Sequence, residues 1–214
     1  MDLLWIKTNP IIKRIFSNYV WSIPNREKKV FLTFDDGPIP EITDWVLDQL
    51  KTYHFKATFF CIGNNIVNHP DIFNRIIQEG HAIGNHTFDH VKGWSTPNKT
   101  YLRQVEKCQE AIQKASHYNL SAKLFRPPYG KIKPLQSIKL RKSGYKIIMW
   151  DVLSADYKKE ISKEKCLENV IRHVEPGSII VFHDSKKAFR NLEYALPKTL
   201  QFLSENGYQC DVIR

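Results

Sequence analysis

The stretch VFLTFDDGP, from Val30 to Pro38, carries the pattern that decides the fold. A short run that is apolar on both faces is typical of a buried strand in a parallel sheet. It ends in two adjacent carboxylates, Asp35 and Asp36, which are costly to bury unless they are ion-paired, hydrogen-bonded or bound to a metal. An Asp-Gly turn would explain Asp36 alone. The doublet therefore indicates a functional site at the end of this strand.

Similar apolar runs recur along the chain and are separated by amphipathic stretches. The predicted strands are Val30–Phe34, Ala57–Phe60, Ala82–Gly84, Lys123–Phe125, Lys146–Trp150, Ser178–Phe182 and Tyr208–Val212. The predicted helices are Glu41–Tyr53, Lys99–Ala115, Pro134–Lys142, Lys163–Val174 and Leu192–Ser204. Strands that alternate with helices about seven times predict an α/β fold with a parallel sheet. Such a sheet can close as a barrel or stay open as a doubly wound sheet.

The chain has 214 residues, with no internal repeat and no Gly/Ser linker, which favours one domain. We expect residues 30–214 to form this domain and residues 1–29 to form an N-terminal amphipathic extension packed on it. Within residues 11–20, six apolar side chains fall on one helical face. This face favours docking against the domain over the alternative, contact with a membrane surface.

The formal net charge is +10, from 32 Lys and Arg against 22 Asp and Glu. A basic balance suits nucleic acid, a membrane surface or an acidic glycan. The charges are scattered, however, in short clusters such as Lys158-Lys159 and Lys186-Lys187, as on a solvated surface. No basic helix, aromatic-basic strand or zinc finger is present, so we expect no nucleic-acid partner.

Cysteine spacing and hydropathy further restrict the class of protein to which the chain can belong. The four cysteines form no CxxC pair, which excludes a zinc ribbon and favours buried free thiols. No apolar run approaches the ~20 residues of a membrane span. Lys7, Lys13 and Arg14 interrupt the N-terminal apolar stretch, so no signal peptide is expected. The sequence slightly favours the cytoplasm as the cellular compartment but does not decide it. It indicates no oligomeric state.

A pair of histidines follows the third predicted strand, in the stretch GNHTFDH. His86 and His90 are four residues apart, so one turn of helix would place both imidazoles on the same side. With one carboxylate of the Asp35–Asp36 pair they supply a His-His-Asp metal site with open coordination positions. The same ligand set serves non-haem iron oxygenases. Those enzymes usually have an antiparallel β architecture, which this βα pattern does not match.

Three later strands also end in polar residues. Arg126, in FRPPYG, can pair with a carboxylate. Asp151 and Asp156 lie in WDVLSADY, and GSIIVFHDS contains His183 and Asp184, with the histidine where a general acid would be expected. Because the carboxyl ends of parallel strands meet at one edge, we expect these groups to converge. The other histidines are expected to be structural or surface residues: His54, His69, His81, His117 and His173.

Three motifs in order, TFDDGP (33–38), HTFDH (86–90) and RPPYG (126–130), resemble those of the polysaccharide deacetylases. This is the NodB-homology family, or carbohydrate esterase family 4, and the resemblance covers roughly Val30 to Val212. It implies a distorted (β/α)7 barrel of the NodB-homology type. It also implies a metal-dependent hydrolase that removes N-acetyl groups from N-acetylglucosamine in chitin or peptidoglycan, or O-acetyl groups from xylan.

The resemblance assigns roles to the residues of these motifs. Asp35 would be the general base, held by Arg126. The metal ligands would be Asp36, His86 and His90. Zn²⁺ is the expected ion, with Co²⁺ or Mn²⁺ as alternatives.

The same resemblance assigns the other half of the site. His183 would be the general acid, held by Asp156. The backbone N–H of Tyr129 would stabilise the oxyanion, and Trp94, in the loop after the second motif, is expected to stack on a sugar ring of an acetylated glycan. The fourth motif of the family often reads Asp-x-x-Asp-Trp, whereas this chain has Leu153 and Tyr157 at its first and last positions.

Three alternatives to an N-acetyl hydrolase stay open at this point. The same fold could hydrolyse O-acetyl esters or a non-glycan amide. It could also be a carbohydrate-binding module without turnover, although the complete set of acidic and histidine residues argues against the loss of catalysis.

Overall fold

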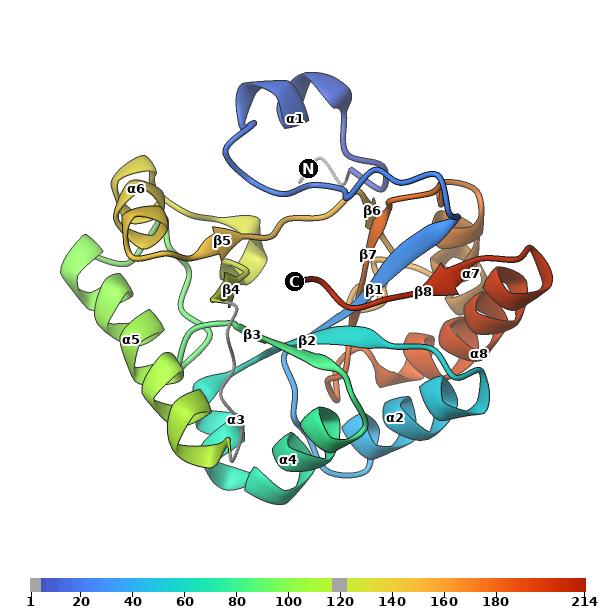
Figure 1. Ribbon diagram of the computed structural model, residues 1–214, viewed down its shortest axis with the longest axis horizontal. Coiled ribbons are helices and arrows are strands. Elements are labelled where there is room, and N and C mark those ends of the chain that lie inside the picture. The colour runs from blue at the N-terminus through green and yellow to red at the C-terminus, as the bar shows by residue number, and fades with distance from the viewer. Residues whose placement is uncertain (1–4, 117–122) are drawn as a thin grey trace.

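The structure is a computed structural model that describes residues 5–116 and 123–214. Parallel strands curl around a central axis in the order β5-β4-β3-β2-β1-β7-β6, and β8 pairs with the start of β1 (Figure 1). Their bounds are β1 Lys29–Asp35, β2 Ala57–Cys61, β3 Ala82–Asn85, β4 Leu124–Phe125, β5 Lys146–Ile147, β6 Val152–Leu153, β7 Ile179–His183 and β8 Gln209–Cys210. The curled path of seven parallel strands confirms the predicted distorted (β/α)7 barrel.

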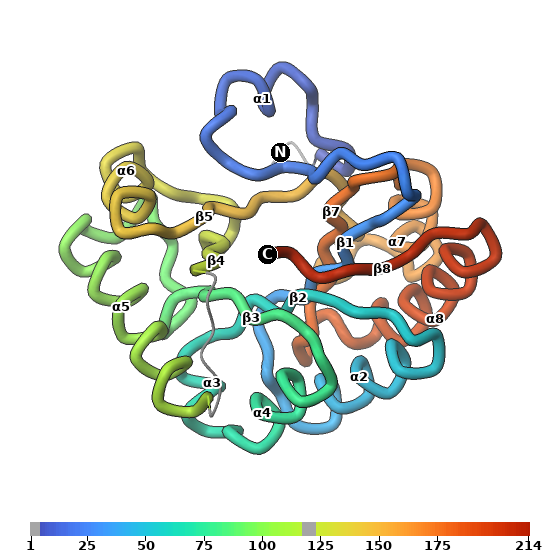
Figure 2. The backbone as a smooth tube through the Cα atoms, in the orientation of Figure 1, coloured from blue at the N-terminus to red at the C-terminus, as the bar shows by residue number. Residues whose placement is uncertain are grey.

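The helices lie on the outside of the curled sheet, as the backbone trace shows (Figure 2). They are α1 Pro10–Ile15, α2 Ile42–Thr52, α3 Gly63–Asn68, α4 Pro70–Gln78, α5 Asn98–Ala115, α6 Pro134–Lys142, α7 Lys163–Ile171 and α8 Phe189–Glu205, with a 3₁₀ turn, η1, at Pro128–Gly130. Amphipathic spacing explains the longer ones. In α5, for example, Tyr101, Val105, Cys108 and Ile112 are buried at helical intervals on one face.

The sequence analysis missed α3 and α4. Helix α3 has six residues, too few to show apolar periods, and α4 begins at Pro70, separated by one residue from the end of α3 at Asn68. It also missed β6, whose two buried residues stand between Asp151 and Ser154. The predicted strand Lys146–Trp150 ends at Ile147, and Tyr208–Val212 shortens to Gln209–Cys210. The seven strands of the main path therefore include β6 in place of the C-terminal strand that was predicted.

The densest packing surrounds the central strands. Phe34 on β1 stacks against Phe59 of β2 and Phe182 of β7, with ring centroids 5.1 and 6.1 Å away. Burying each such ring contributes roughly 1.5–3 kcal/mol to stability. On the other face of β2, Gly84 of β3 leaves room for the Phe60 ring, because a Cβ there would stand 2.3 Å from that ring. All four cysteines are free and buried, as predicted.

The N-terminal segment lies beside the two edge strands of the sheet, β5 and β6. On one side, Val20 exchanges backbone hydrogen bonds with Ile147 and Met149, at 2.8 and 2.7 Å. On the other side, the N–H of Leu153 donates to the carbonyl of Ile6 at 2.8 Å. Helix α1 sits over this part of the barrel (Figure 1). The segment thereby occupies the opening between the two edges.

A buried carboxylate anchors the same segment. Asp151 accepts hydrogen bonds from the ammonium groups of Lys7, at 2.6 Å, and Lys13, and from the Ser178 hydroxyl at 2.6 Å. Burial alone would raise the pKa of Asp151, but these three donors outweigh it and hold that pKa below its ordinary value. The expectation that Asp151 converges with the other strand-end groups is therefore wrong, because its partners are Lys7, Lys13 and Ser178.

Helix α1 is shorter than the helical face that the sequence suggested. It ends at Ile15, and the side chains of Ile11, Ile15 and Phe16 are exposed rather than packed on the barrel. Residues 1–4 of the predicted extension and His117 lie outside the described residues. Among the helices that are described, none combines the length and the hydropathy needed to cross a membrane.

Candidate active site

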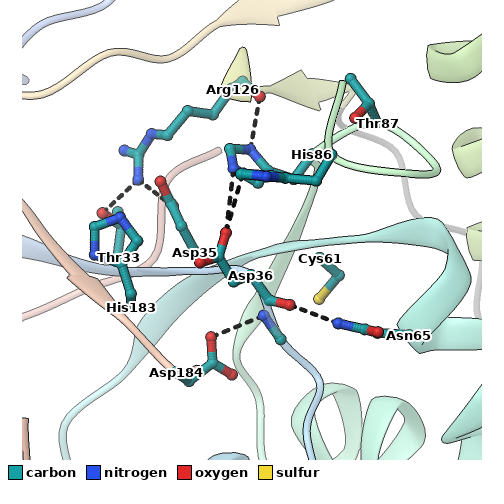
Figure 3. Close-up of polar contacts among 12 residues, drawn as sticks. Thr33, Asp35, Asp36, Cys61, Asn65, His86, Thr87, Arg126, His183 and Asp184 are labelled. Atoms are coloured by element: carbon teal, nitrogen blue, oxygen red, sulfur yellow. Dashed lines mark hydrogen bonds and ion pairs between the residues drawn. The ribbon is translucent and has the colours of Figure 1, made fainter. Parts of the chain in front are cut away.

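The end of β1 places Asp35 inside the barrel. Its carboxylate accepts a hydrogen bond from Arg126 Nη1 at 2.7 Å, and the same Nη1 donates to the Thr33 hydroxyl at 2.7 Å (Figure 3). Arg126 is fully buried after β4, and its other nitrogens donate to the carbonyls of Ile148 and Met149. A buried guanidinium is tolerated only when it is paired and hydrogen-bonded in this way. The ion pair fixes the orientation of the Asp35 carboxylate.

The charge of Asp35 follows from the same contacts. Burial alone would raise the pKa of Asp35. The positive charge of Arg126, with smaller contributions from His86 and His183, outweighs burial and leaves that pKa below its ordinary value. Asp35 is therefore ionised at neutral pH.

The adjacent residue, Asp36, turns the opposite way, toward two histidines (Figure 3). Its Oδ1 lies 3.2 Å from His90 Nε2 and 3.7 Å from His86 Nε2. This oxygen is buried, and no described residue donates a hydrogen bond to it. A buried carboxylate oxygen without a hydrogen-bond donor is unusual in a folded protein and indicates a missing partner. One ligand atom from each of the three residues lies within 4.8 Å of the others, an arrangement that fits a divalent cation.

The hydrogen bonding of His86 supports the same interpretation. Its Nδ1 lies 2.8 Å from the carbonyl oxygen of Arg126, an acceptor, so Nδ1 carries the proton and Nε2 presents its lone pair to Asp36. Burial lowers the pKa of His86. Burial, followed by the charge of His86, lowers the pKa of His90 to about 4. Both imidazoles are therefore neutral at pH 7, the form that binds a metal.

The prediction of a helical turn for His86 and His90 is wrong. The segment after β3 is an irregular loop, with left-handed backbone at Thr87 (φ 63°) and His90 (φ 54°). Asn85 holds this loop, because its Oδ1 accepts from the Thr87 N–H at 3.0 Å and its Nδ2 donates to the Val105 carbonyl at 2.8 Å. Positive φ at non-glycine residues costs energy and is concentrated at functional sites.

Two further residues, to which the sequence analysis gave no role, hold the turn that carries Asp36. Asp184 accepts from the Gly37 N–H at 3.0 Å and from the Thr43 hydroxyl at 2.6 Å. Asn65 Nδ2 donates to the carbonyl of Asp36 at 2.7 Å. Asp184 could have been found, since it directly follows His183 at a strand end. Asn65 lies in α3, which was not predicted, so nothing in the sequence pointed to it.

Burial is the main cause that raises the pKa of Asp184, to about 8, and the neighbouring charge of Asp36 adds to it. The carboxyl group of Asp184 is fully buried beside the turn. Its two hydrogen bonds are what offset the cost of placing it there.

The end of β7 supplies His183, which is paired with Asp156. The ring Nδ1 lies 2.8 Å from Asp156 Oδ1, and the His183 backbone N–H donates to Asp156 Oδ2 at 2.8 Å. Burial alone would lower the pKa of His183, but the charge and hydrogen bond of Asp156 outweigh it and raise that pKa to about 9. The imidazole is therefore a cation at neutral pH, with a fixed orientation.

The two residues expected at the substrate lie on the loops after β3 and β4. Tyr129 has left-handed backbone (φ 60°), and its ring centroid lies 4.7 Å from that of His90. Within the described residues, its backbone N–H donates to no acceptor. Trp94 is 59% exposed and contacts Lys131 and the Ile132 carbonyl rather than a side chain of the His-His-Asp cluster. Both rings are thus accessible, and only that of Tyr129 touches this cluster.

Comparisons with known proteins agree with this geometry. The family model described as Polysaccharide deacetylase matches residues 22–148. A peptidoglycan-N-acetylglucosamine deacetylase of Bacillus cereus is 38% identical over 167 residues, which are 78% of this chain and 60% of the relative. The peptidoglycan-N-acetylmuramic acid deacetylase PdaC of Bacillus subtilis is 33% identical over 186 residues, 87% of this chain and 38% of the relative. The chain thus spans less than two thirds of either relative.

Among solved structures, the Bc1960 peptidoglycan N-acetylglucosamine deacetylase superposes with a TM-score of 0.86 at 33% identity. The match covers 96% of this chain and 95% of the other. The similarity therefore extends over almost the whole chain.

Proposed function

Because the chain belongs to the polysaccharide deacetylase family, we propose that it is a metal-dependent hydrolase of acetylated glycans. Its substrates would be chitin-like or peptidoglycan-like chains, from whose N-acetylglucosamine units it removes N-acetyl groups. The observation that carries this proposal is the buried, unpartnered Oδ1 of Asp36 facing two neutral histidines, next to an ionised carboxylate that is held elsewhere.

An acetamide resists hydrolysis because its carbonyl is a weak electrophile and its amine a poor leaving group. A divalent cation held by Asp36, His86 and His90 would polarise the carbonyl and lower the pKa of water at the site. The ligand set of two imidazoles and a carboxylate favours Zn²⁺, with Co²⁺ or Mn²⁺ as alternatives.

Asp35 is suited to act as the general base. It is ionised, and Arg126 holds one of its oxygens at 2.7 Å, so the carboxylate is positioned without being a member of the His-His-Asp cluster. It can therefore accept the proton of the attacking water.

His183 is suited to act as the general acid. Asp156 keeps its imidazole protonated and oriented, so it can donate a proton to the departing amine. The unpartnered backbone N–H of Tyr129 can donate to the oxygen on which negative charge develops. In this scheme the base and the acid are two separate groups, each held in its charged state by its own partner.

Acetate release from N-acetylglucosamine oligomers tests the proposal. The protein is treated with EDTA and assayed with and without added Zn²⁺ or Co²⁺. We expect release to return with the metal in the native protein and in Asp48→Asn, a control that removes an exposed surface carboxylate. In Asp35→Asn we expect a loss of at least 10²-fold with metal affinity unchanged, as measured by calorimetry.

Two results would count against this proposal. If the protein binds metal but releases no acetate from any amide, the activity shifts to O-acetyl esters. If no metal binds, the catalytic interpretation fails and a non-catalytic carbohydrate-binding module becomes the better explanation.

A further inference from the structure

Two lysine pairs that are far apart in the sequence meet at one side of the candidate active site. Lys158-Lys159 lie in the loop after β6, and Lys186-Lys187 lie in the turn after β7. Strands β6 and β7 are parallel neighbours, so both loops emerge at the same edge of the barrel (Figure 1). The intervals 157–161 and 185–190 together hold five basic residues and one acidic residue, Glu160. This side of the site is therefore strongly positive.

A chain of contacts links this charge to the proposed general acid. The Lys187 ammonium lies over the Tyr157 ring, 5.6 Å from its centroid. The Tyr157 ring in turn packs edge-on against the His183 imidazole, with centroids 4.8 Å apart. Lys187 is exposed, and Tyr157 is half-buried. One aromatic ring thus separates an exposed cation from the imidazole that faces the reacting bond.

The loop that carries Tyr157 is fixed in place. The buried side chain of Asn191, in the first turn of α8, donates from Nδ2 to the carbonyls of Asp156, Lys158 and Ile161 at 2.9, 3.3 and 3.2 Å. The position of the tyrosine ring is thereby set before any ligand arrives. Preorganisation of this kind lowers the entropic cost of binding.

The lysines of this edge lack internal counter-ions. Across residues 5–116 and 123–214, no carboxylate oxygen lies within 4.0 Å of the ammonium groups of Lys158, Lys159, Lys186 or Lys187. A bound anion would gain a charge-assisted contact with these ammonium groups.

Resting on the function proposed above, we infer that Tyr157 and Lys187 form a subsite for an anionic group of the substrate. Tyr157 holds the ammonium of Lys187 near His183, and Lys187 offers a cation for a carboxylate on the acetylated sugar or on the sugar next to it. The protein would therefore act on acidic acetylated glycans in preference to neutral ones of equal length.

A matched pair of substrates tests the subsite. One is a glycan fragment of alternating N-acetylglucosamine and N-acetylmuramic acid, and the other is the same fragment with its carboxylates converted to methyl esters. The readout is kcat/KM for acetate release at low and high salt. We expect the native protein to favour the acid over the ester by about ten-fold at low salt, and by less at high salt.

Two variants separate the subsite from general charge effects. Lys187→Gln should lower the ratio of kcat/KM for the acid to kcat/KM for the ester by about three- to five-fold. Lys198→Gln is the matched control, because this lysine also lies over a tyrosine, Tyr194, at 5.0 Å, but further along α8. Lys198→Gln should keep the native preference.

Each outcome bears on one proposal. Equal rates on acid and ester, with activity that depends on Asp35, would overturn the subsite and leave the deacetylase standing. A preference that falls equally in both lysine variants would also overturn it. If neither substrate is hydrolysed, calorimetric binding of the acid and the ester to the Asp35→Asn protein decides the subsite independently of turnover.

Discussion

The pairing of Asp156 with His183 makes a sharp prediction about pH. Asp156→Asn removes the negative charge that keeps the imidazole protonated and leaves the shape of the side chain nearly unchanged. The pKa of His183 is about 9 with Asp156 in place, against an ordinary value of 6.5. In the variant, burial still lowers the pKa of His183, and no carboxylate at Nδ1 raises it. This pKa should therefore fall to about 6.5 or lower.

The size of the effect follows from these values. With a pKa of about 9, roughly 90% of His183 is protonated at pH 8. With a pKa of about 6.5, roughly 3% is protonated, so activity at pH 8 should drop about 30-fold. At pH 6 both forms are mostly protonated, and the loss should be less than about two-fold. The loss caused by the variant therefore grows as the pH rises.

The assay is kcat/KM for acetate release from pH 5 to pH 10, with the metal kept saturating. The alkaline limb of the profile should move to lower pH in Asp156→Asn. His183→Ala, run alongside, should lose activity at every pH and lack this limb. An unchanged alkaline limb in Asp156→Asn, or an equal loss at pH 6 and pH 8, would refute the assignment of His183 as the acid.

Three other perturbations test separate parts of the structure. In Gly37→Ala, the new Cβ would stand 2.0 Å from the Asp184 carboxylate, so the turn that carries Asp36 must move. We expect the metal affinity, measured by calorimetry, to weaken by at least about ten-fold. An unchanged metal affinity would contradict this expectation. Asp151→Asn weakens the anchor of the N-terminal segment and should lower the free energy of unfolding in urea by about 3 kcal/mol; an unchanged value would contradict the role of this anchor. Burial is the main cause that lowers the pKa of His81 to about 4. The unfolded chain therefore binds a proton at this histidine more tightly than the folded protein does. The free energy of unfolding should be highest above about pH 6.5 and fall by up to about 3 kcal/mol toward pH 4. His81→Gln should flatten that loss between pH 7 and pH 4.5, and an equally steep loss would assign it to other groups.

Much of the barrel could be predicted from local pattern. The runs around Val30–Phe34 and Ser178–Phe182 are apolar on both faces, which is typical of a buried parallel strand. The functional side chains could be listed for the same reason, because the carboxyl ends of such strands share one edge. The short elements escaped prediction. Strand β6 has two residues and α3 has six, too few for a period to appear.

The sequence by itself indicated most of the residues that meet, since polar groups placed after buried parallel strands have one edge in common, but it wrongly included Asp151 and did not indicate Asn65. Only the tertiary structure decided how they meet. His86 and His90 converge through an irregular loop, Asp184 and Asn65 hold the turn of Asp36, and Lys187 reaches the edge of the site across Tyr157. The physical reason is that these contacts join residues far apart in the chain. Their geometry depends on the packing of neighbouring strands and loops, which no local period records.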